Sequence, residues 1–529
     1  MTLRLREVPL ELEADESGLA TVVASELGVA FGAVHNLHIV RVAVDARRKS
    51  RLLKVYTIEF DLEDEPGTLA RNRSNPRLEA VPPVSLPDFF AIPGRSRALV
   101  VGMGPAGLFA ALGLARSGVD VTLVEQGRAV ETRVRDVERF WSGGGLDPGS
   151  NVQFGEGGAG TFSDGKLTTR INHPWTRLVL QTLVDCGAPE AILTEAKPHI
   201  GTDRLRLVLI RFRQLLQRLG VDIRFETRLT ALACDGRQLR AGRFGSDEIA
   251  CDNLILAPGH SARDTYAMLH AAGVHLEAKA FAMGVRVEHP VELINSIQYG
   301  LPHHPRLPNA EYSLTWNDPV SGRGIYSFCM CPGGEVVIAS SEPGGVVVNG
   351  MSRLRRDRPF SNSALVVAVR PDDFSGSGPL SGVAFQRSWE EAAFRSGGGD
   401  YRAPAQNLLS FLGRGSGPLC STARPGVHEA DLSQVLPPFV TEGIRLALPH
   451  FDRRMRGFIT GEATLLGVES RTSAPLRIVR GEDGQSISHS GLYPAGEGAG
   501  YAGGIISAAL DGLRSAEKIV QRLNTSGVR

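Results

Sequence analysis

Residues 98–118 read ALVVGMGPAGLFAALGLARSG, and this stretch decides the fold. Its first four residues are apolar and predict a short buried strand, which opens into the glycine loop of residues 102–107. A helical stretch, residues 108–116, then leads to a second apolar strand at residues 121–125. Strand, loop, helix and strand make one βαβ unit of about thirty residues. The sequence therefore predicts an α/β protein with a parallel sheet.

The glycine loop has the spacing of a dinucleotide-binding site. Gly102 permits the tight turn, Gly104 lets a pyrophosphate approach the backbone, and Gly107 lets the helix pack against the strand. The helix that begins near Pro105 directs free N–H groups and the positive end of its dipole at that phosphate. Glu125 ends the second strand, where a carboxylate can accept hydrogen bonds from ribose hydroxyls. We interpret the unit as a dinucleotide site.

A second Gly-x-Gly-x-x-Gly match spans residues 155–160. Residues 150–154 make a poor buried strand before it, and residues 161–165 do not form a helix after it. We therefore reject a second Rossmann site there. The segment is either a loop that wraps a bound cofactor or a purely structural loop.

The C-terminal part of the chain indicates which dinucleotide is bound. Residues 492–498, LYPAGEG, precede an apolar helical pattern that starts near residues 503–510. This pattern supplies a second helix N-terminus, about 400 residues after the first. NAD needs one such end for its pyrophosphate, whereas the longer FAD also rests its ribityl and flavin on another loop. The spacing favours FAD.

Composition excludes several classes of protein. The chain has 529 residues, which predicts two to four domains, and a net charge of +1, which argues against a nucleic-acid-coating protein. Its six cysteines are scattered and make no disulfide framework. Neither a signal peptide nor an apolar run long enough to span a bilayer is evident. These features predict a cytoplasmic protein that does not contact a membrane.

The pattern of strands, helices and prolines predicts five parts. They are a small α+β module at 1–64, a linker with six prolines at 65–95, the first part of the nucleotide-binding domain at 96–277, an inserted β-rich substrate domain at 278–430, and the C-terminal part of the nucleotide-binding domain at 431–529. Within the first module, the basic segment 47–51 is expected to be a solvated hairpin loop. Docking of an acidic protein partner or RNA is the alternative.

Six segments of the chain resemble the bacterial family of uncharacterised FAD-dependent dehydrogenases. They are VVGMGPAGLFAALGLARSG (100–118), VQFGEGGAGTFSDGKL (152–167), LILAPGHSARDT (254–265), FCMCPGGEVV (328–337), VESRTSAPLRI (468–478) and GLYPAGEGAGYAGGIISAALDGL (491–513). More distantly, the chain is similar to the glutathione-reductase and p-hydroxybenzoate-hydroxylase superfamily. The resemblance implies a discontinuous Rossmann-like FAD-binding domain, an inserted β-rich domain and an N-terminal ferredoxin-like domain.

The resemblance also implies which residues bind FAD. Those for the pyrophosphate and adenosine ribose are Gly102, Gly104, Pro105, Ala106, Gly107, Glu125 and Arg128. Those of the loop near the flavin and of the following strand end are Gly158, Gly160, Thr161, Ser163, Asp164, Lys166 and Gly259. Those for the ribityl and the pyrimidine edge are Gly496, Glu497, Gly503, Gly504 and Ile505. Many relatives in the wider superfamily have Asp where this chain has Glu497.

Three residues are candidates for catalysis. Lys166 could stabilise the anionic reduced flavin near N1–C2, or could be a surface lysine after a turn. His260 follows a strand at its carboxyl end, where open α/β folds place ligands. Arg471 could bind an anionic substrate, or could pair internally with Glu469.

Absent motifs and a cysteine pair limit the chemistry. No C-x4-C pair lies beside the first glycine loop, which argues against a disulfide reductase, and no second βαβ nucleotide unit indicates a stable NAD(P)H domain. Cys329 and Cys331 are expected to point to one face of a strand. Buried structural thiols are the first interpretation, and a redox or substrate contact is the second. No metal site is predicted, because further soft ligands are missing.

The sequence thus predicts an FAD-dependent oxidoreductase that oxidises, or reduces, a small organic substrate by two electrons. One alternative is a flavin monooxygenase that takes electrons from transiently bound NAD(P)H. An alternative of another class is an RNA-associated flavoprotein, although the near-zero net charge makes nucleic acid a poor partner. A protein partner of the N-terminal domain is a further expectation.

Overall fold

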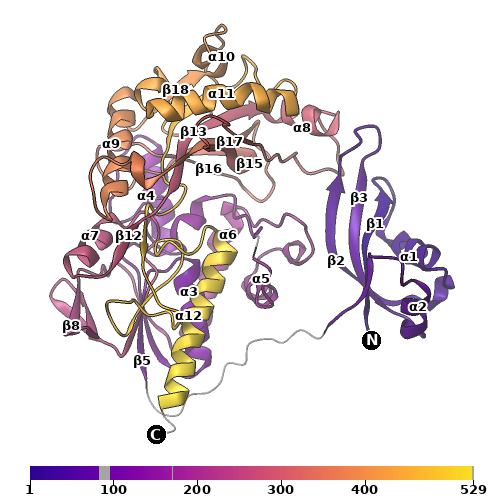
Figure 1. The fold of residues 1–529 in the computed structure, drawn as a ribbon, viewed down its shortest axis with the longest axis horizontal. Helices are drawn as coiled ribbons and strands as arrows, with labels where there is room; N and C mark the ends of the chain where they lie inside the picture. Colours follow the sequence, from indigo (N-terminus) through magenta and orange to yellow (C-terminus); the bar gives the residue numbers. More distant parts are fainter. Residues whose placement is uncertain (83–95, 170, 527–529) are drawn as a thin grey trace.

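The computed structural model describes residues 1–82, 96–169 and 171–526 (Figure 1). A five-stranded parallel sheet organises the nucleotide-binding part, in the order β22-β11-β5-β6-β7. Its strands are β5 (Arg97–Val101), β6 (Asp120–Val124), β7 (Asp222–Arg224), β11 (Asn253–Leu256) and β22 (Leu492–Pro494). This parallel α/β sheet fits the predicted Rossmann-like fold.

The two distant parts of the chain pack together through a pair of helices. α3 (Pro105–Arg116) begins with proline, whose missing N–H would have no partner in the first turn. The long α12 (Ile505–Ser526), yellow in Figure 1, runs beside α3. A Cβ on Gly512 would lie 2.0 Å from the carbonyl oxygen of Ala106, so the close contact requires glycine. The segments before and after the β-rich insertion therefore form one domain.

Further elements surround this sheet. Its other helices are α4 (Val130–Trp141), α5 (Thr176–Asp185), α6 (Thr202–Arg218) and α7 (Arg263–Ala271). A three-stranded antiparallel sheet consists of β8 (Ala231–Asp235), β9 (Gln238–Phe244) and β10 (Asp247–Ala250). Phe109 of α3 meets Phe212 of α6 edge to face, with ring centroids 5.1 Å apart. This contact anchors α6 on the helix that follows the first glycine loop.

The β-rich part is a second sheet of eight strands. The order is β14-β15-β17-β13-β20-β18-β19, and β16 pairs with β15. The strands are β13 (Phe281–Pro290), β14 (Thr315–Asn317), β15 (Gly324–Ile338), β16 (Val348–Met351), β17 (Phe360–Val369), β18 (Ala403–Asn407), β19 (Val427–Glu429) and β20 (Thr464–Glu469). Its helices are α8 (Val291–Tyr299), α9 (Ser381–Ser396), α10 (Leu408–Phe411) and α11 (Pro438–Arg454), and α11 packs along β13 and β17 (Figure 1).

The predicted end of the β-rich part at residue 430 was wrong. β20 lies inside the sheet, between β13 and β18, so the sheet continues to Glu469. The sequence from residue 464 reads TLLGVE, which is as apolar as a strand of the parallel sheet. Hydrophobicity alone could not assign it to one sheet or the other. A two-stranded ribbon of β12 (Leu276–Ala278) and β21 (Leu476–Ile478) joins the two parts.

The N-terminal part is a four-stranded antiparallel sheet with two helices. In chain order the elements are β1 (Leu3–Glu11), α1 (Leu19–Leu27), β2 (His35–Asp45), β3 (Leu53–Asp61), α2 (Glu65–Arg71) and β4 (Leu78–Ala80), and the strand order is β2-β3-β1-β4. Inward residues such as Leu3, Tyr56 and Phe60 are completely buried. Residues 47–51 connect β2 to β3, as the predicted hairpin requires.

The predicted linker at 65–95 began too early. Pro66, taken as a sign of a linker, lies in the first turn of α2, where proline is well tolerated. β4 pairs with β1, so residues up to Ala80 belong to the N-terminal sheet. Residues 83–95, the rest of the predicted linker, lie outside the described residues.

The N-terminal sheet contacts the main body through its edge strand β2 (Figure 1). The N–H of Val42 donates to the carbonyl of Thr194 at 2.8 Å, and the N–H of Ala196 donates back to Val42 at 2.8 Å. Arg306 adds a bond of 3.2 Å to the carbonyl of Leu12.

Across residues 1–82, 96–169 and 171–526, no helix is both long and apolar enough to traverse a membrane.

Candidate FAD site

A pocket of about 400 Å³ opens at the carboxyl ends of β5, β6, β11 and β22. Open α/β sheets bind their ligands at this edge. The wall opposite the sheet comes from the β-rich part, through Phe328, Cys329 and Asn349. Most of the predicted residues line the pocket: Gly102, Gly104, Pro105, Ala106, Glu125, Gly158, Gly160, Ser163, Asp164, Lys166, Gly259, His260, Arg471, Gly496, Glu497, Gly503, Gly504 and Ile505.

The first glycine loop has the shape that a pyrophosphate requires. Gly102 has a φ of +98°, and a Cβ there would lie 2.1 Å from the carbonyl oxygen of Ala257. A Cβ on Gly107 would lie 1.8 Å from the carbonyl oxygen of Gly102, which confirms its packing role. A Cβ on Gly104, by contrast, would meet no atom within 4 Å. The space beside Gly104 is therefore free for a ligand at the start of α3.

Glu125 ties the glycine loops together. Its buried carboxylate accepts hydrogen bonds from the N–H groups of Met103 at 2.8 Å, Gly127 at 2.9 Å and Gly155 at 3.0 Å. The sequence did not indicate these backbone contacts, because Gly155 lies thirty residues away. Glu125 also lines the pocket, where contact with a ribose stays a prediction.

Three predicted residues do not line the pocket. The guanidinium of Arg128 instead contacts the carboxylates of Asp136 at 3.0 Å and Glu226 at 3.1 Å. The hydroxyl of Thr161 donates to the carbonyl of Glu156 at 2.9 Å, inside the protein. Gly107 lies beneath the loop, at the contact with Gly102.

The second glycine loop ends in a 3-10 turn at Gly158–Phe162 and is not part of a βαβ unit. Arg133 of α4 fixes its shape and is completely buried. Its guanidinium donates to four carbonyl oxygens, those of Asn151, Val152, Glu156 and Gly158. Burial lowers the pKa of Arg133 to about 10, which leaves it cationic at neutral pH. Sequence reasoning missed Arg133, because nothing in its helix distinguishes it from surface arginines.

Asp164 and Lys166 continue from this loop toward the β-rich part. The carboxylate of Asp164 forms a bidentate pair with Arg356, at 2.5 and 3.0 Å. Burial raises the pKa of Asp164, but Arg356 outweighs it and holds the pKa below its usual value. The ammonium of Lys166 donates to the carbonyl of Met330 and lies 3.8 Å from Glu311. Lys166 is therefore a half-buried residue of the pocket rather than a surface lysine.

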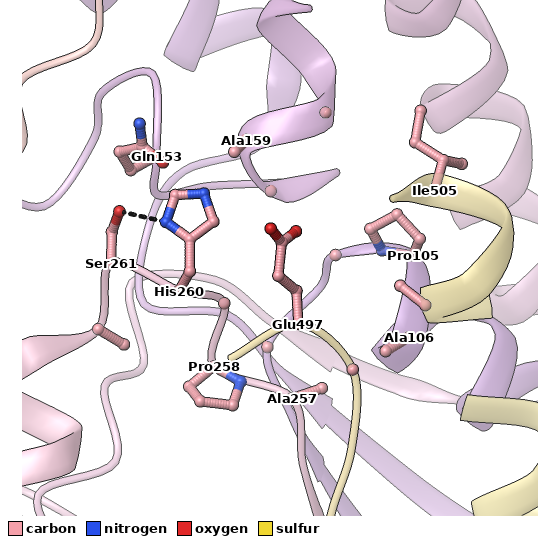
Figure 2. A pocket seen from close by; sticks show the side chains of 18 of the residues that line it. Pro105, Ala106, Gln153, Ala159, Ala257, Pro258, His260, Ser261, Glu497 and Ile505 are labelled. Atoms are coloured by element: carbon pink, nitrogen blue, oxygen red, sulfur yellow. Dashed lines mark hydrogen bonds between the residues drawn. The ribbon is translucent and has the colours of Figure 1, made fainter. Parts of the chain in front are cut away.

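Glu497 projects from the C-terminal loop into the middle of the pocket (Figure 2). Its surroundings raise the pKa of this carboxyl to about 7, because burial outweighs the opposing charge of Lys279. The loop is held from behind by Asp511, which accepts from the N–H of Gly496 at 2.7 Å and pairs with Arg480 at 2.6 Å. The carboxyl of Glu497 is therefore free to face a cofactor.

His260 faces the same space from the end of β11 (Figure 2). Its Nδ1 lies 3.0 Å from the hydroxyl of Ser261. Burial, and then the charges of Arg471 and Arg263, lower the pKa of His260 to about 3. The imidazole is therefore neutral at physiological pH and can either accept or donate one hydrogen bond from Nε2.

The predicted pairing of Arg471 with Glu469 was wrong. Arg471 binds Glu390 of α9 at 2.8 and 3.0 Å, while Glu469 pairs with Arg286. Arg471 lines the pocket, where contact with an anionic substrate stays a prediction. Arg263 binds the same carboxylate at 2.7 and 2.9 Å. Although burial raises the pKa of Glu390, the two arginines lower it well below its usual value. The sequence could not indicate this ion pair, because Glu390 lies 81 residues from Arg471.

The prediction that the side chains of Cys329 and Cys331 point to one face of a strand was also wrong. The pairing of β15 with β17 is irregular between Phe328 and Cys331, and Cys329 has a φ of +46°. Cys329 consequently lines the pocket, whereas Cys331 is buried behind it. The prediction of two buried structural thiols is wrong for Cys329, since a bulge breaks the period of two on which it depended.

Comparisons with known proteins define the class of this protein. Residues 97–160 match the FAD binding domain, and residues 280–472 match the family described as FAD-dependent protein, C-terminal domain-like. FAD is the cofactor, and the open space at Gly104, which a Cβ would fill, fits its pyrophosphate. The protein is thus a flavoprotein of the oxidoreductase type.

An uncharacterised protein of Clostridium beijerinckii is 42% identical over 530 residues, which is 99% of each chain. This chain and that relative belong to one family, and the domain matches of this chain make it a family of FAD-dependent proteins.

Solved structures with a similar arrangement are more remote. CtdE in complex with FAD is 11% identical, with a TM-score of 0.33 over 82% of this chain and 86% of that chain. A geranylgeranyl bacteriochlorophyll reductase-like protein of Thermoplasma acidophilum is 11% identical, with a TM-score of 0.36 over 82% and 80%. A flavoprotein/dehydrogenase of Cytophaga hutchinsonii is 13% identical, with a TM-score of 0.34 over 82% and 79%.

Proposed function

We propose that this protein is an FAD-dependent dehydrogenase that removes two electrons from a small organic substrate. The observation that carries the proposal is the composition of the pocket. One side is glycine backbone at two helix N-termini, and the other is a wall of titratable side chains, His260, Lys166 and Cys329. Bound FAD supplies two-electron transfer at its flavin ring. The protein has to place the cofactor and a substrate against each other.

Residues at four places in the pocket are proposed to hold FAD. The pyrophosphate lies at Gly104, where the N-terminus of α3 supplies free N–H groups. The adenosine ribose lies toward Glu125. The ribityl chain passes Glu497, whose raised pKa lets the carboxyl donate a hydrogen bond as well as accept one. Gly503 and Gly504, where a Cβ would meet only open space or the hydroxyl of Ser507, lie under the flavin at the start of α12.

The substrate is proposed to enter between the flavin and the β-rich wall. His260, neutral because of its low pKa, is the candidate proton acceptor for a substrate that loses hydrogen. Lys166 lies 3.8 Å from Glu311 and is the candidate to stabilise negative charge on the reduced flavin.

For the N-terminal part we propose the ferredoxin-like assignment. The order β1-α1-β2-β3-α2-β4 and the antiparallel arrangement β2-β3-β1-β4 support it. Its placement beside residues 194–196, away from the pocket, favours an adaptor over a catalytic role.

Anaerobic mixing of the FAD-loaded protein with NADH and with NADPH tests the dehydrogenase proposal. We expect no bleaching of the flavin absorbance by either nucleotide, and bleaching by a substrate selected from a panel of small alcohols, amines and acids. Rapid bleaching by NADH or NADPH would overturn the proposal in favour of a reductase or a monooxygenase. Lys166→Met gives a second readout, since it is expected to lower the flavin potential measured against a dye.

A further inference from the structure

Strand β15, which contributes to the β-rich wall of the pocket, carries two thiols where its pairing with β17 is irregular. Cys329 lines the pocket and Cys331 is buried. Cys329 has a φ of +46°, at the irregular point of β15. The sulfur of Cys331 donates to the carbonyl of Cys329 at 3.4 Å. The Cys331 thiol is thus held against the backbone of Cys329, directly behind the pocket.

Two positively charged side chains contact the backbone of the segment that holds the two thiols. Arg286 is completely buried and donates to the carbonyl of Cys329 at 3.1 Å, while it pairs with Glu469 at 2.9 Å. Lys166 donates to the carbonyl of Met330, between the two cysteines. Two cationic side chains thus contact the backbone of residues 329–330, of which Cys329 lines the pocket.

The two thiols differ in their ease of ionisation. A hydrogen bond from the Cys331 thiol lowers the pKa of Cys329 and outweighs its burial, and Arg286 and Lys166 lower it further. The same hydrogen bond, together with burial, raises the pKa of Cys331. Cys329, on the pocket side, is therefore the more acidic thiol of the two. A low-pKa thiolate beside a second thiol is the arrangement that forms disulfides readily.

We propose that Cys329 and Cys331 are a redox-active pair that exchanges two electrons with bound FAD. In the oxidative direction the Cys329 thiolate and the Cys331 thiol form one S–S bond. The two electrons and the Cys331 proton pass to oxidised FAD, which becomes the anionic two-electron-reduced flavin. The reverse reaction breaks the S–S bond and reoxidises the flavin. This inference rests on FAD as the cofactor and does not depend on which substrate the protein oxidises.

The other four cysteines are placed differently. Burial raises the pKa of Cys186 to about 11 and that of Cys251 to about 12, so these thiols stay protonated. Cys234 and Cys420 are exposed at the surface. None of the four lines the pocket. A disulfide that depends on FAD can therefore be assigned to one pair.

Thiol counting on the FAD-loaded wild-type protein tests the proposal without any variant. The protein is oxidised with ferricyanide or reduced with dithionite, denatured without oxygen, and reacted with a chromogenic disulfide. We expect four of the six thiols to react after oxidation and all six after reduction. Peptide mass spectrometry is expected to show a loss of two hydrogens in the peptide that holds Cys329 and Cys331. Six reactive thiols after oxidation, or a disulfide elsewhere, would overturn the proposal.

An anaerobic reductive titration gives an independent readout. Wild-type protein is expected to take up four electrons per FAD, whereas Cys329→Ser and Cys331→Ser are expected to take up two. Cys251→Ser is the matched control, because this thiol is buried away from the pocket, and it is expected to take up four. Two electrons per FAD in the wild type would exclude the pair. Such a result would leave the dehydrogenase proposal intact, since that proposal is tested by NAD(P)H and substrate.

Discussion

The carboxylate of Glu125 and the backbone N–H of Gly155 form a hydrogen bond of 3.0 Å, which joins the end of β6 to the second glycine loop. The other oxygen of Glu125 accepts from Met103, in the first glycine loop. One side chain therefore sets the distance between the two loops that face FAD.

This relationship predicts the effect of Glu125→Gln. The amide oxygen can keep the contacts with Gly127 and Gly155, but the NH₂ group then faces the N–H of Met103, which loses its acceptor. An unsatisfied buried N–H costs about 1–3 kcal/mol. We expect a loss of stability of that size in urea unfolding and at least a tenfold weaker FAD affinity in fluorescence titration. Glu226→Gln, at an exposed residue that contacts Arg128, is the control and is expected to bind FAD normally.

The first glycine loop predicts opposite outcomes for two alanine substitutions. Gly104→Ala places its methyl group in open space at a φ of −75°, so the FAD-free protein is expected to keep its melting temperature. FAD affinity is expected to fall more than tenfold, because the methyl group occupies the place proposed for the pyrophosphate. Gly107→Ala is expected to destabilise even the FAD-free protein, because its Cβ would lie 1.8 Å from a carbonyl oxygen. Normal FAD binding by Gly104→Ala would refute the proposed pyrophosphate position.

The buried pairing of Glu390 with Arg263 and Arg471 predicts a pH-dependent cost for Glu390→Gln. Loss of the charge leaves two buried guanidinium groups poorly compensated, which costs about 3–5 kcal/mol at pH 7. Burial raises the pKa of Glu390, but the arginines lower it far more, below its value of 4.5 in the unfolded chain. The carboxylate's contribution is therefore complete above pH 4.5 and is lost as the pH falls further.

Urea unfolding of the wild type and Glu390→Gln at pH 7 and below pH 4.5 measures this contribution. The difference between the two proteins is expected to shrink by about 1 kcal/mol per pH unit below 4.5. Glu391→Gln, an exposed neighbour on the same helix, is expected to show no such dependence. A difference that stays constant with pH would contradict the pairing.

Ionisation of Glu497 is expected to lower the stability of the FAD-free protein, whereas ionisation of Glu390 raises it. Burial raises its pKa to about 7 in the folded protein, against 4.5 in the unfolded chain. The folded state therefore favours the protonated form, and ionisation destabilises it progressively as the pH rises from 4.5 to 7. Glu497→Gln is expected to gain stability relative to the wild type between pH 5 and pH 8, by at most about 3 kcal/mol. Glu482→Gln, at an exposed residue, is the control for urea unfolding at both pH values.

Local patterns in the sequence were sufficient to predict the parallel sheet and most of the residues around its pocket. The strand at residues 98–101, the glycine spacing and the apolar helix after Gly504 each depend on short-range periodicity, and each lies where it was expected. Short-range signals also distinguished the second glycine loop from a Rossmann unit, since residues 158–162 form only a 3-10 turn.

Long-range contacts could not be predicted in the same way. The partner of Arg471 is Glu390 rather than the nearby Glu469, because pairing between buried charges is decided by how sheets and helices pack. A bulge in β15 turned Cys329 toward the pocket, and neither its position nor its φ follows from residue types. The β-rich part was cut short at residue 430, because a strand does not indicate which of two sheets it will join.

The packing of α12 against α3 also has a consequence for biosynthesis. Gly512 touches Ala106, and the C-terminal loop contributes Glu497, Gly503 and Gly504 to the pocket, so part of the pocket wall is translated long after the first glycine loop. A nascent chain that has been translated through β11 can already form the first βαβ unit, yet it has only one wall for its coenzyme. Flavin capture at a complete pocket therefore requires residues 495–508, which are translated long after the first glycine loop.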